Sequence, residues 1–182
     1  RPLIAQVNSN QTQSVAMELA PGGLGLRGIV PVFFQNEPIG SFEVAIAIDK
    51  STLDHFVKEY GNEWHILLTQ ESVLTNMPQD LLTMQAGPVE NLLLYASTSE
   101  TPLYSLPSAY AQTINEAQDV VEEVEINEGN YAILTTPILD YTGTVIGVLE
   151  IVNDRTEITT IQNTRLATGG IFGVLVLLLG SV

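Results

Sequence analysis

The sequence predicts an α+β fold in which antiparallel sheets carry helices, and three observations point to it. Residues 26–48 combine two apolar strands with a turn between them. Residues 131–153 repeat this pattern later in the chain. Two segments with helical spacing, 51–60 and 108–118, lie between the two hairpins. Strands joined by short turns and interrupted by helices are typical of antiparallel α+β domains.

The first hairpin shows the alternation expected of a strand with one buried face. Phe42, Val44 and Ile46 alternate with small or polar residues. Successive side chains of a strand point to opposite faces of its sheet. We therefore expect the side of the strand that carries Phe42 to be buried.

The two hairpins are interpreted as copies of one module, because the same short motifs occur in the same order. Corresponding positions are Pro31-Val32 and Pro137-Ile138, Ile39-Gly40 and Ile146-Gly147, and Glu43 and Glu150. The turns differ in length by one residue, which is common in surface connections.

The remaining elements follow from local patterns. The sequence predicts a helix end at 3–8, strands at 14–19, 63–69, 91–96 and 120–126, and helices at 51–60 and 108–118. Asp49 is the expected N-cap of the first long helix, and Gly61 is expected to end it. Residues 70–90 are expected to be rich in loops, since Pro78 and Gly87-Pro88 interrupt them, and the polar stretch 97–107, with two prolines, is expected to be a loop.

Composition excludes several classes of function. The chain has 182 residues and a formal net charge of −15, which argues against binding to nucleic acid or to an anionic membrane surface. It contains no cysteine, so disulfides, thiolate catalysis and zinc–thiolate sites are excluded. Only two histidines are present, and their spacing suggests no metal site. We expect no metal and no cofactor.

The C-terminal segment predicts a membrane helix. Asp154 is an N-cap candidate, with Glu157 as its capping-box partner. From Leu166 to Val182 no residue is charged, which is close to the length that spans a bilayer. The alternative is a buried C-terminal core helix. The chain begins at Arg1 without a methionine, and we interpret it as a fragment.

The segments GLGLRGIVPVFFQNEPIGSFEVAIAID at 23–49 and YAILTTPILDYTGTVIGVLEIVND at 131–154 resemble the double Cache sensory domains of bacterial transmembrane receptors. The resemblance implies PAS-like modules: a partial membrane-distal module at 1–49, a membrane-proximal module at 50–153, and a helix entering the membrane at 154–182. It also implies an extracytoplasmic or periplasmic location at the inner membrane, and a homodimer. Its usual outputs are methyl-accepting chemotaxis domains, histidine kinases or cyclic-di-GMP enzymes.

Arg27 is the first candidate for ligand binding. Its segment GLGLRGIVPVF resembles the part of citrate and C4-dicarboxylate sensors in which an arginine holds the ligand, so an organic acid is one candidate ligand. A guanidinium can grip a carboxylate through two hydrogen bonds. The alternative is a cross-strand ion pair with Glu18 or Glu43.

Aromatic residues of the second module are a second set of candidates for a small-molecule pocket between sheet and helix. They are Trp64, His65, Tyr95, Tyr110 and Tyr131. The alternative is ordinary core packing. Asp140 is interpreted as a turn residue, and Glu122, Glu123 and Glu125 as a solvated edge.

The sequence carries no pattern typical of an enzyme. A Ser-His-Asp order with a supporting motif, a phosphate loop and a conspicuous carboxylate pair are all missing from it. We therefore expect a ligand-sensing domain that acts through its C-terminal helix and has no catalytic residues. The alternative is a Cache-like spacer or protein-interaction domain of a membrane protein that binds no ligand.

Overall fold

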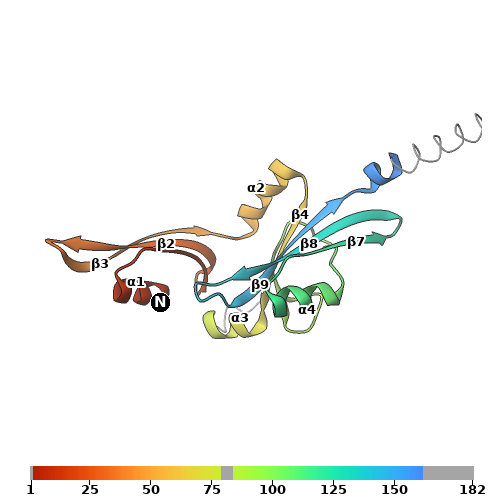
Figure 1. The fold of residues 1–182 in the computed structure, drawn as a ribbon. Coiled ribbons are helices and arrows are strands. Elements are labelled where there is room, and N and C mark those ends of the chain that lie inside the picture. The colour runs from red at the N-terminus through yellow and green to blue at the C-terminus, as the bar shows by residue number, and fades with distance from the viewer. Residues whose placement is uncertain (1, 79–83, 162–182) are drawn as a thin grey trace, which may run out of the picture.

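The computed structural model describes residues 2–78 and 84–161, and Figure 1 labels their helices and strands. In chain order they are α1 (Pro2–Asn10), β1 (Ser14–Ala20), β2 (Gly23–Phe34), β3 (Glu37–Ala47), α2 (Lys50–Tyr60), β4 (Glu63–Thr69), α3 (Gln70–Asn76), β5 (Gln85–Ala86), β6 (Leu92–Ser97), α4 (Pro107–Glu116), β7 (Val120–Ile126), β8 (Gly129–Leu139) and β9 (Val145–Asp154).

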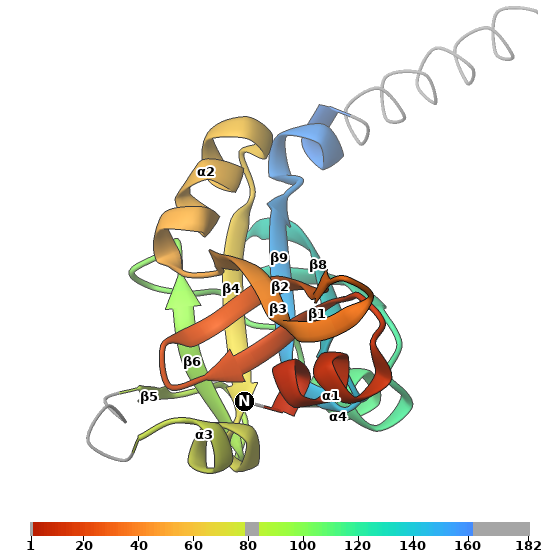
Figure 2. The ribbon, with the colours of Figure 1, turned by 90° about the vertical axis from the view of Figure 1, so that its left-hand side faces the viewer.

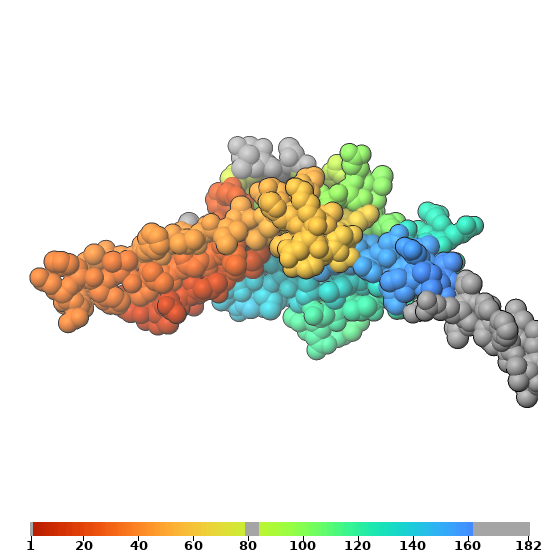
Figure 3. Space-filling model, turned by 90° about the horizontal axis from the view of Figure 1, so that it is seen from above, coloured from red at the N-terminus to blue at the C-terminus, as the bar shows by residue number. Residues whose placement is uncertain are grey.

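The strands form two antiparallel sheets, as the sequence predicts. β1, β2 and β3 make a three-stranded sheet, and the six-stranded sheet has the order β5-β6-β4-β9-β8-β7. The molecule is elongated, and the β2–β3 hairpin projects from one end of it (Figures 1 and 3). Both predicted hairpins are present, with Leu26 paired to Ile46 in one and Pro137 to Val148 in the other.

A helix followed by three strands occurs twice, which extends the predicted repeat beyond the hairpins. The helices α1 and α4 have 9 and 10 residues. The strands that follow have 7, 12 and 11 residues in the first copy and 7, 11 and 10 in the second. Each helix is followed by a residue with positive φ, Gln11 at 55° and Ala117 at 51°. The two copies therefore share their order of elements and the way their helices end.

Local chemistry explains the boundaries of α2. The Asp49 side chain accepts a hydrogen bond from the backbone N–H of Thr52 at 3.1 Å. At the other end Gly61 adopts φ 72°, a left-handed conformation that glycine reaches without a steric penalty. Both predicted caps of this helix are confirmed.

Helices and the smaller sheet cover the two faces of the six-stranded sheet. In Figure 1 α2 lies above this sheet and α4 below it. On the α2 side Leu53 packs with Ile66 and Leu68 of β4, and Leu19 and Leu24 bring the end of the three-stranded sheet into the same cluster. Figure 2 shows the molecule from the side on which the β2–β3 hairpin projects. On the α4 side Tyr110 packs with Leu67, Leu92 and Val148.

The stretch 70–90, predicted only to be rich in loops, also contains helix α3 and the short strand β5, which the sequence did not predict. Thr69 caps α3, accepting a hydrogen bond from the backbone N–H of Ser72 at 3.3 Å. Val73 is fully buried against the three-stranded sheet side of the core. A helix of 7 residues, or about two turns, with one buried residue shows too little periodicity to be recognised in the sequence.

The expected burial of the Phe42 side of β3 is also wrong. Phe42, Val44 and Ile46 are 61%, 57% and 57% exposed. Helix α1 packs instead on the opposite face of the three-stranded sheet, where Leu3 and Val7 contact Ile29. The alternation itself is present, but the described residues cover only one side of this sheet.

The chain after β9 turns directly into a helix. Asp154 accepts a hydrogen bond from the backbone N–H of Thr156 at 2.8 Å, and residues 156–161 are helical. The predicted membrane segment from Leu166 onward lies outside the described residues. Within the described part, none of the helices has the length and apolar character needed to cross a bilayer.

Candidate ligand-binding site

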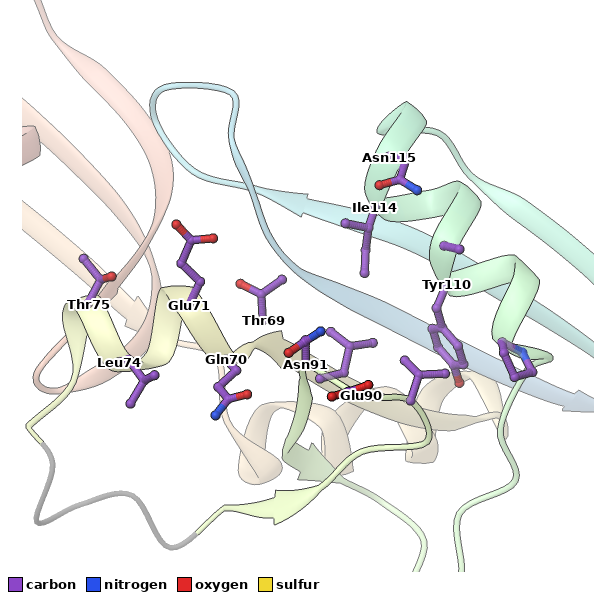
Figure 4. Close-up of a pocket in the computed structure, with 14 residues that line it drawn as sticks. Thr69, Gln70, Glu71, Leu74, Thr75, Glu90, Asn91, Tyr110, Ile114 and Asn115 are labelled. Atoms are coloured by element: carbon purple, nitrogen blue, oxygen red, sulfur yellow. The ribbon is translucent and has the colours of Figure 1, made fainter.

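A cleft of about 810 Å³ opens between α3 and α4, over the end of the six-stranded sheet. Figure 4 shows side chains of α3 on one side, those of α4 on the other, and Glu90 and Asn91 between them. The lining residues are Thr69, Gln70, Glu71, Leu74, Thr75, Val89, Glu90, Asn91, Leu92, Pro107, Tyr110, Ala111, Ile114 and Asn115. Its size is that of pockets that hold small organic molecules.

The cleft combines apolar walls with hydrogen-bonding groups. Leu74 comes from α3, Leu92 from the start of β6, and Ile114 from α4. Asn91 and Asn115 add amide groups, each of which can both donate and accept hydrogen bonds. A ligand with a hydrocarbon body and one or more polar groups would match this lining.

Tyr110 joins the cleft to a buried polar cluster. It lines the cleft from α4 although only 1% of the residue is exposed. Its phenol group donates a hydrogen bond to Oε2 of Glu150, which is fully buried on β9. The backbone N–H of Ser105 donates to the same Oε2 at 3.0 Å and also reaches the Tyr110 oxygen at 3.1 Å. A displacement of Tyr110 would therefore alter its hydrogen bond to Glu150 on a central strand of the sheet.

The buried cluster is a row of polar side chains across four neighbouring strands. In the strand register Ser97 of β6 pairs with His65 of β4, His65 pairs with Glu150 of β9, and Glu150 pairs with Thr135 of β8. His65, Glu150 and Thr135 are each 0% exposed. Thr113 of α4 covers the row and shares a hydrogen bond with Thr135 at 2.7 Å. The row lies under α4, on the side of the sheet from which Tyr110 approaches.

Burial controls the acidity of Glu150. Loss of contact with water raises the pKa of this carboxyl from 4.5 to about 7, although the hydrogen bonds from Tyr110 and Ser105 oppose the shift and the charge of Glu122 adds to it. Burial also raises the pKa of the Tyr110 phenol, with further contributions from Glu150. Near neutral pH Glu150 thus lies close to the midpoint of its titration.

His65 is buried as the neutral imidazole. Burial lowers its pKa from 6.5 to about 4. The Ser97 hydroxyl donates to the carbonyl of Ser99 at 2.6 Å, so the contact of 3.1 Å between His65 Nδ1 and Ser97 Oγ requires the proton to be on Nδ1. Nε2 is then a buried acceptor, and the described residues provide no hydrogen bond to it.

Glu122 belongs to the same cluster, and its interpretation as part of a solvated edge is wrong. Its Oε2 accepts hydrogen bonds from the Ser105 hydroxyl and, at 3.0 Å, from the backbone N–H of Leu106. Glu123 and Glu125, which point to the other face of β7, are exposed. Alternation along the strand separates Glu122 from its two acidic neighbours.

Arg27 lies outside the cleft, on the smaller sheet. Its Nε is 2.9 Å from Glu18 and its Nη1 is 2.9 Å from Glu43. The cross-strand ion pairs that the sequence allowed are therefore present, with both acids at once. Asp140 is confirmed as a turn residue, because its side chain accepts from the backbone N–H groups of Thr142 and Thr144.

The predicted aromatic set is divided between the two faces of the sheet. His65 and Tyr110 lie on the α4 side, whereas Trp64 and Tyr95 pack against the cluster on the α2 side. Trp64 packs against Phe56 with the two rings tilted to each other and their centroids 5.1 Å apart. Only Tyr110 of the predicted residues lines the cleft.

Tyr95 and Tyr131 have other positions. The Tyr95 hydroxyl accepts a hydrogen bond from the backbone N–H of Leu24 at 3.0 Å, which ties β6 to the smaller sheet. Tyr131 lines a separate hollow of about 340 Å³ beside Arg155 and Thr159. Among residues 2–78 and 84–161 no group of His, Cys, Asp and Glu has the geometry to hold a metal ion.

Sequence reasoning missed most of the cleft. The α3 side, with Gln70, Glu71 and Leu74, falls in a stretch that was predicted to be rich in loops. Asn91, which has φ 70°, carries the turn into β6, and a turn residue of this type gives no sign of its proximity to a pocket. Glu150 was visible only as a repeated acid after an Ile-Gly pair.

The antiparallel sheet covered by helices, with a cleft beside it, fits a Cache or PAS-like fold. The family model described as the double sensory domain of two-component sensor kinase, dCache_3, matches residues 1–158. The chain therefore belongs to this family of double Cache sensor domains. No curated protein matches it significantly.

Two solved structures are similar to the chain at low identity. The ligand-binding domain of the Pseudomonas fluorescens chemoreceptor CtaA, in complex with L-serine, is 14% identical over 85% of this chain and 60% of that chain, with a TM-score of 0.38. The ligand-binding domain of the Pseudomonas aeruginosa PAO1 amino acid chemoreceptor PctB, in complex with L-Gln, is 15% identical over 93% and 64%, with a TM-score of 0.35. The chain thus spans less than two thirds of either domain.

Proposed function

We propose that this chain is the extracytoplasmic ligand-sensing domain of a bacterial transmembrane receptor, and that a small molecule binds in the cleft between α3 and α4. The family match supports a sensory role. The observation that carries the site is the cleft of about 810 Å³, with apolar walls and convergent amide and hydroxyl groups. In this proposal the domain binds its ligand without transforming it.

The proposed signal leaves the cleft through Tyr110. Its hydrogen bond to Glu150 connects the cleft wall to β9. β9 ends at Asp154, directly before the helical residues 156–161. A ligand changes the receptor only if it binds two states of this connection unequally. The receptor that would contain the domain is a sensor histidine kinase or a methyl-accepting chemotaxis protein, anchored in the inner membrane and dimeric.

The test is a thermal-shift screen of organic acids, amino acids and amines on the full chain, combined with a variant that fills the cleft. Ala111→Trp places a large ring in the cleft from an exposed position on α4. A compound that raises the melting temperature of the wild-type chain should lose that effect in this variant, whose circular dichroism should be unchanged.

Two outcomes would contradict the proposal. If no compound stabilises the wild-type chain, the domain is a spacer or protein-contact module, which is the alternative that the sequence left open. If a compound stabilises wild type and Ala111→Trp equally, the ligand binds elsewhere. Loss of binding in Arg27→Ala, with normal folding, would place it at the smaller sheet, where an organic acid could meet this arginine.

A further inference from the structure

We propose that the ligand of the cleft is a cation, an organic amine whose protonated nitrogen faces the acidic side of the cleft and whose hydrocarbon body lies on the apolar walls. This inference rests on the proposed function, since it names the chemical class of the molecule that the same cleft would bind. The argument has three independent parts: the charges at the rim, the buried acceptors behind the wall, and the shape of the apolar surface.

The charges at the rim have one sign. Among the described residues that line the cleft, the charged ones are Glu71 on α3 and Glu90 before β6, and none is Lys, Arg or His. Figure 4 shows that Glu71 and Glu90 come from different segments of the chain. A carboxylate ligand would meet repulsion there, whereas an ammonium group would be attracted. The net charge of −15 adds to this preference over longer distances.

Two acceptor atoms of the buried cluster behind Tyr110 receive no hydrogen bond from the described residues. Glu150 uses Oε2 for its bonds to Tyr110 and Ser105, while the described residues provide no partner for its Oε1. Nε2 of His65, the residue paired with Glu150 across β4 and β9, is a second buried acceptor to which the described part of the chain donates no hydrogen bond. Side chains paired directly across antiparallel strands lie roughly 5 Å apart. Neither acceptor lines the cleft, but both lie behind its Tyr110 wall, where their unpaired lone pairs add negative potential to the side of the cleft that an ammonium group would face.

The apolar walls set the shape of the ligand. Leu74, Leu92 and Ile114 come from three different elements and face a common space. A hydrocarbon chain or a ring bound to these walls would place the charged end of the ligand at the rim, in contact with water and close to the two glutamates. For ligands of equal shape, the charge of this end group would then decide which one binds most tightly.

Three probes of nearly equal shape test the charge: 2-phenylethylamine, the neutral 2-phenylethanol and the anionic 3-phenylpropionate. Binding to the full chain is measured by isothermal titration at pH 7.5 and low salt. We expect the amine to bind about tenfold more tightly than the alcohol, and the carboxylate to bind most weakly. High salt should reduce the advantage of the amine, since part of it is long-range attraction.

Matched variants assign the effect to the rim. The double variant Glu71→Gln, Glu90→Gln should lose most of the preference for the amine while its affinity for the alcohol is unchanged. Glu37→Gln, which removes an equally exposed charge at the end of the β2–β3 hairpin, should bind the three probes as wild type does. A second variant, Glu150→Gln, tests the buried acceptor: the amine should again lose affinity relative to the alcohol.

The outcomes separate this inference from the function on which it rests. Equal affinity for the three probes, or tightest binding of the carboxylate, would overturn the amine as ligand while leaving the cleft as the binding site. Binding that Ala111→Trp does not disturb would overturn both, as would the failure of all three probes to bind. An amine preference that survives in the double variant would also contradict the proposal.

Discussion

Glu150 is a carboxyl group held in the centre of a sheet, and its acidity should appear in the stability of the protein. Its pKa in the folded chain is about 7, against 4.5 for the free group, so between these values the folded chain keeps a proton that the unfolded chain has lost. This contribution to stability is complete below pH 4.5 and is lost as the pH rises towards 7. Glu150→Gln cannot titrate. Relative to this variant, the wild-type chain should lose on the order of 3 kcal/mol across the window in urea unfolding. Parallel curves would contradict the assignment.

His65 should give the opposite slope. Its pKa falls from 6.5 to about 4 on folding, so the unfolded chain binds the proton more readily. Its contribution is present above pH 6.5 and is lost as the pH falls towards 4. In wild type the two slopes oppose each other where the windows overlap. His65→Gln should therefore reveal a stability that only falls with rising pH, measured by the same urea series.

Arg27 should matter more for stability than its position on a small sheet suggests. Its side chain is 13% exposed and contacts Glu18, whose side chain is 5% exposed. Removing the cation leaves those acids without their arginine at a poorly hydrated site, which typically costs about 3 kcal/mol or more. Chemical denaturation of Arg27→Ala measures this loss. Lys50→Ala, which breaks an ion pair whose lysine is 63% exposed, should change stability by less than about 1 kcal/mol.

For single residues, the sequence predicted which side chains could bind a ligand better than it predicted where those side chains lie in the fold. Tyr110 could be chosen as an aromatic residue on a predicted helix, and it does line the cleft. Trp64 and His65 are neighbours in the chain and were assigned to one pocket, but they point to opposite faces of β4. The depth of Glu150 depends on which strands flank β9, and this is decided by contacts far apart in the sequence.

At the scale of the elements, β4 leaves no room for a side chain at Gly147 of β9. A Cβ atom there would lie far inside van der Waals contact of the Leu67 carbonyl oxygen and 2.9 Å from the Leu68 side chain. Gly147→Ala must therefore push two central strands apart, and we expect a loss of about 2 kcal/mol in the free energy of unfolding. Gly22→Ala is the matched control, because nothing lies within 4 Å of its added Cβ. Equal melting temperatures for the two variants would contradict the close approach.

Strands and hairpins were predictable because their signals are local. The two-residue turn at Gln35 and Asn36 has φ values of 51° and 66°, which suit a tight hairpin, and apolar alternation marks both of its arms. The strand order is different in kind. β4 lies between β6 and β9 in the sheet. β6 follows β4 closely in the sequence, whereas β9 is separated from β4 by most of the second module. No local sequence pattern predicts the pairing of β4 with β9.

Considered as a whole, the molecule presents an apolar sheet face to solvent. On β2 and β3 this face includes Val30, Phe42, Val44 and Ile46, each at least 40% exposed. Exposed apolar areas of this kind bind hydrophobic dyes and promote association. Phe42→Thr combined with Ile46→Thr should lower the fluorescence of bound anilinonaphthalene sulfonate several-fold without lowering the melting temperature. The pair Tyr60→Thr and Ile158→Thr, exposed elsewhere, should leave the dye signal nearly unchanged.

The position of β9 also limits how this protein can move. β9 is hydrogen-bonded to β4 along one edge and to β8 along the other. If β9 alone slid along its own axis, its backbone hydrogen bonds to both β4 and β8 would break. If a ligand displaces residue 156, as proposed above, we therefore expect a tilt of the whole six-stranded sheet and not a shift of β9 alone. Two spin labels, on β8 and at Glu157, should then keep a fixed separation while both change their distance to a label on α3.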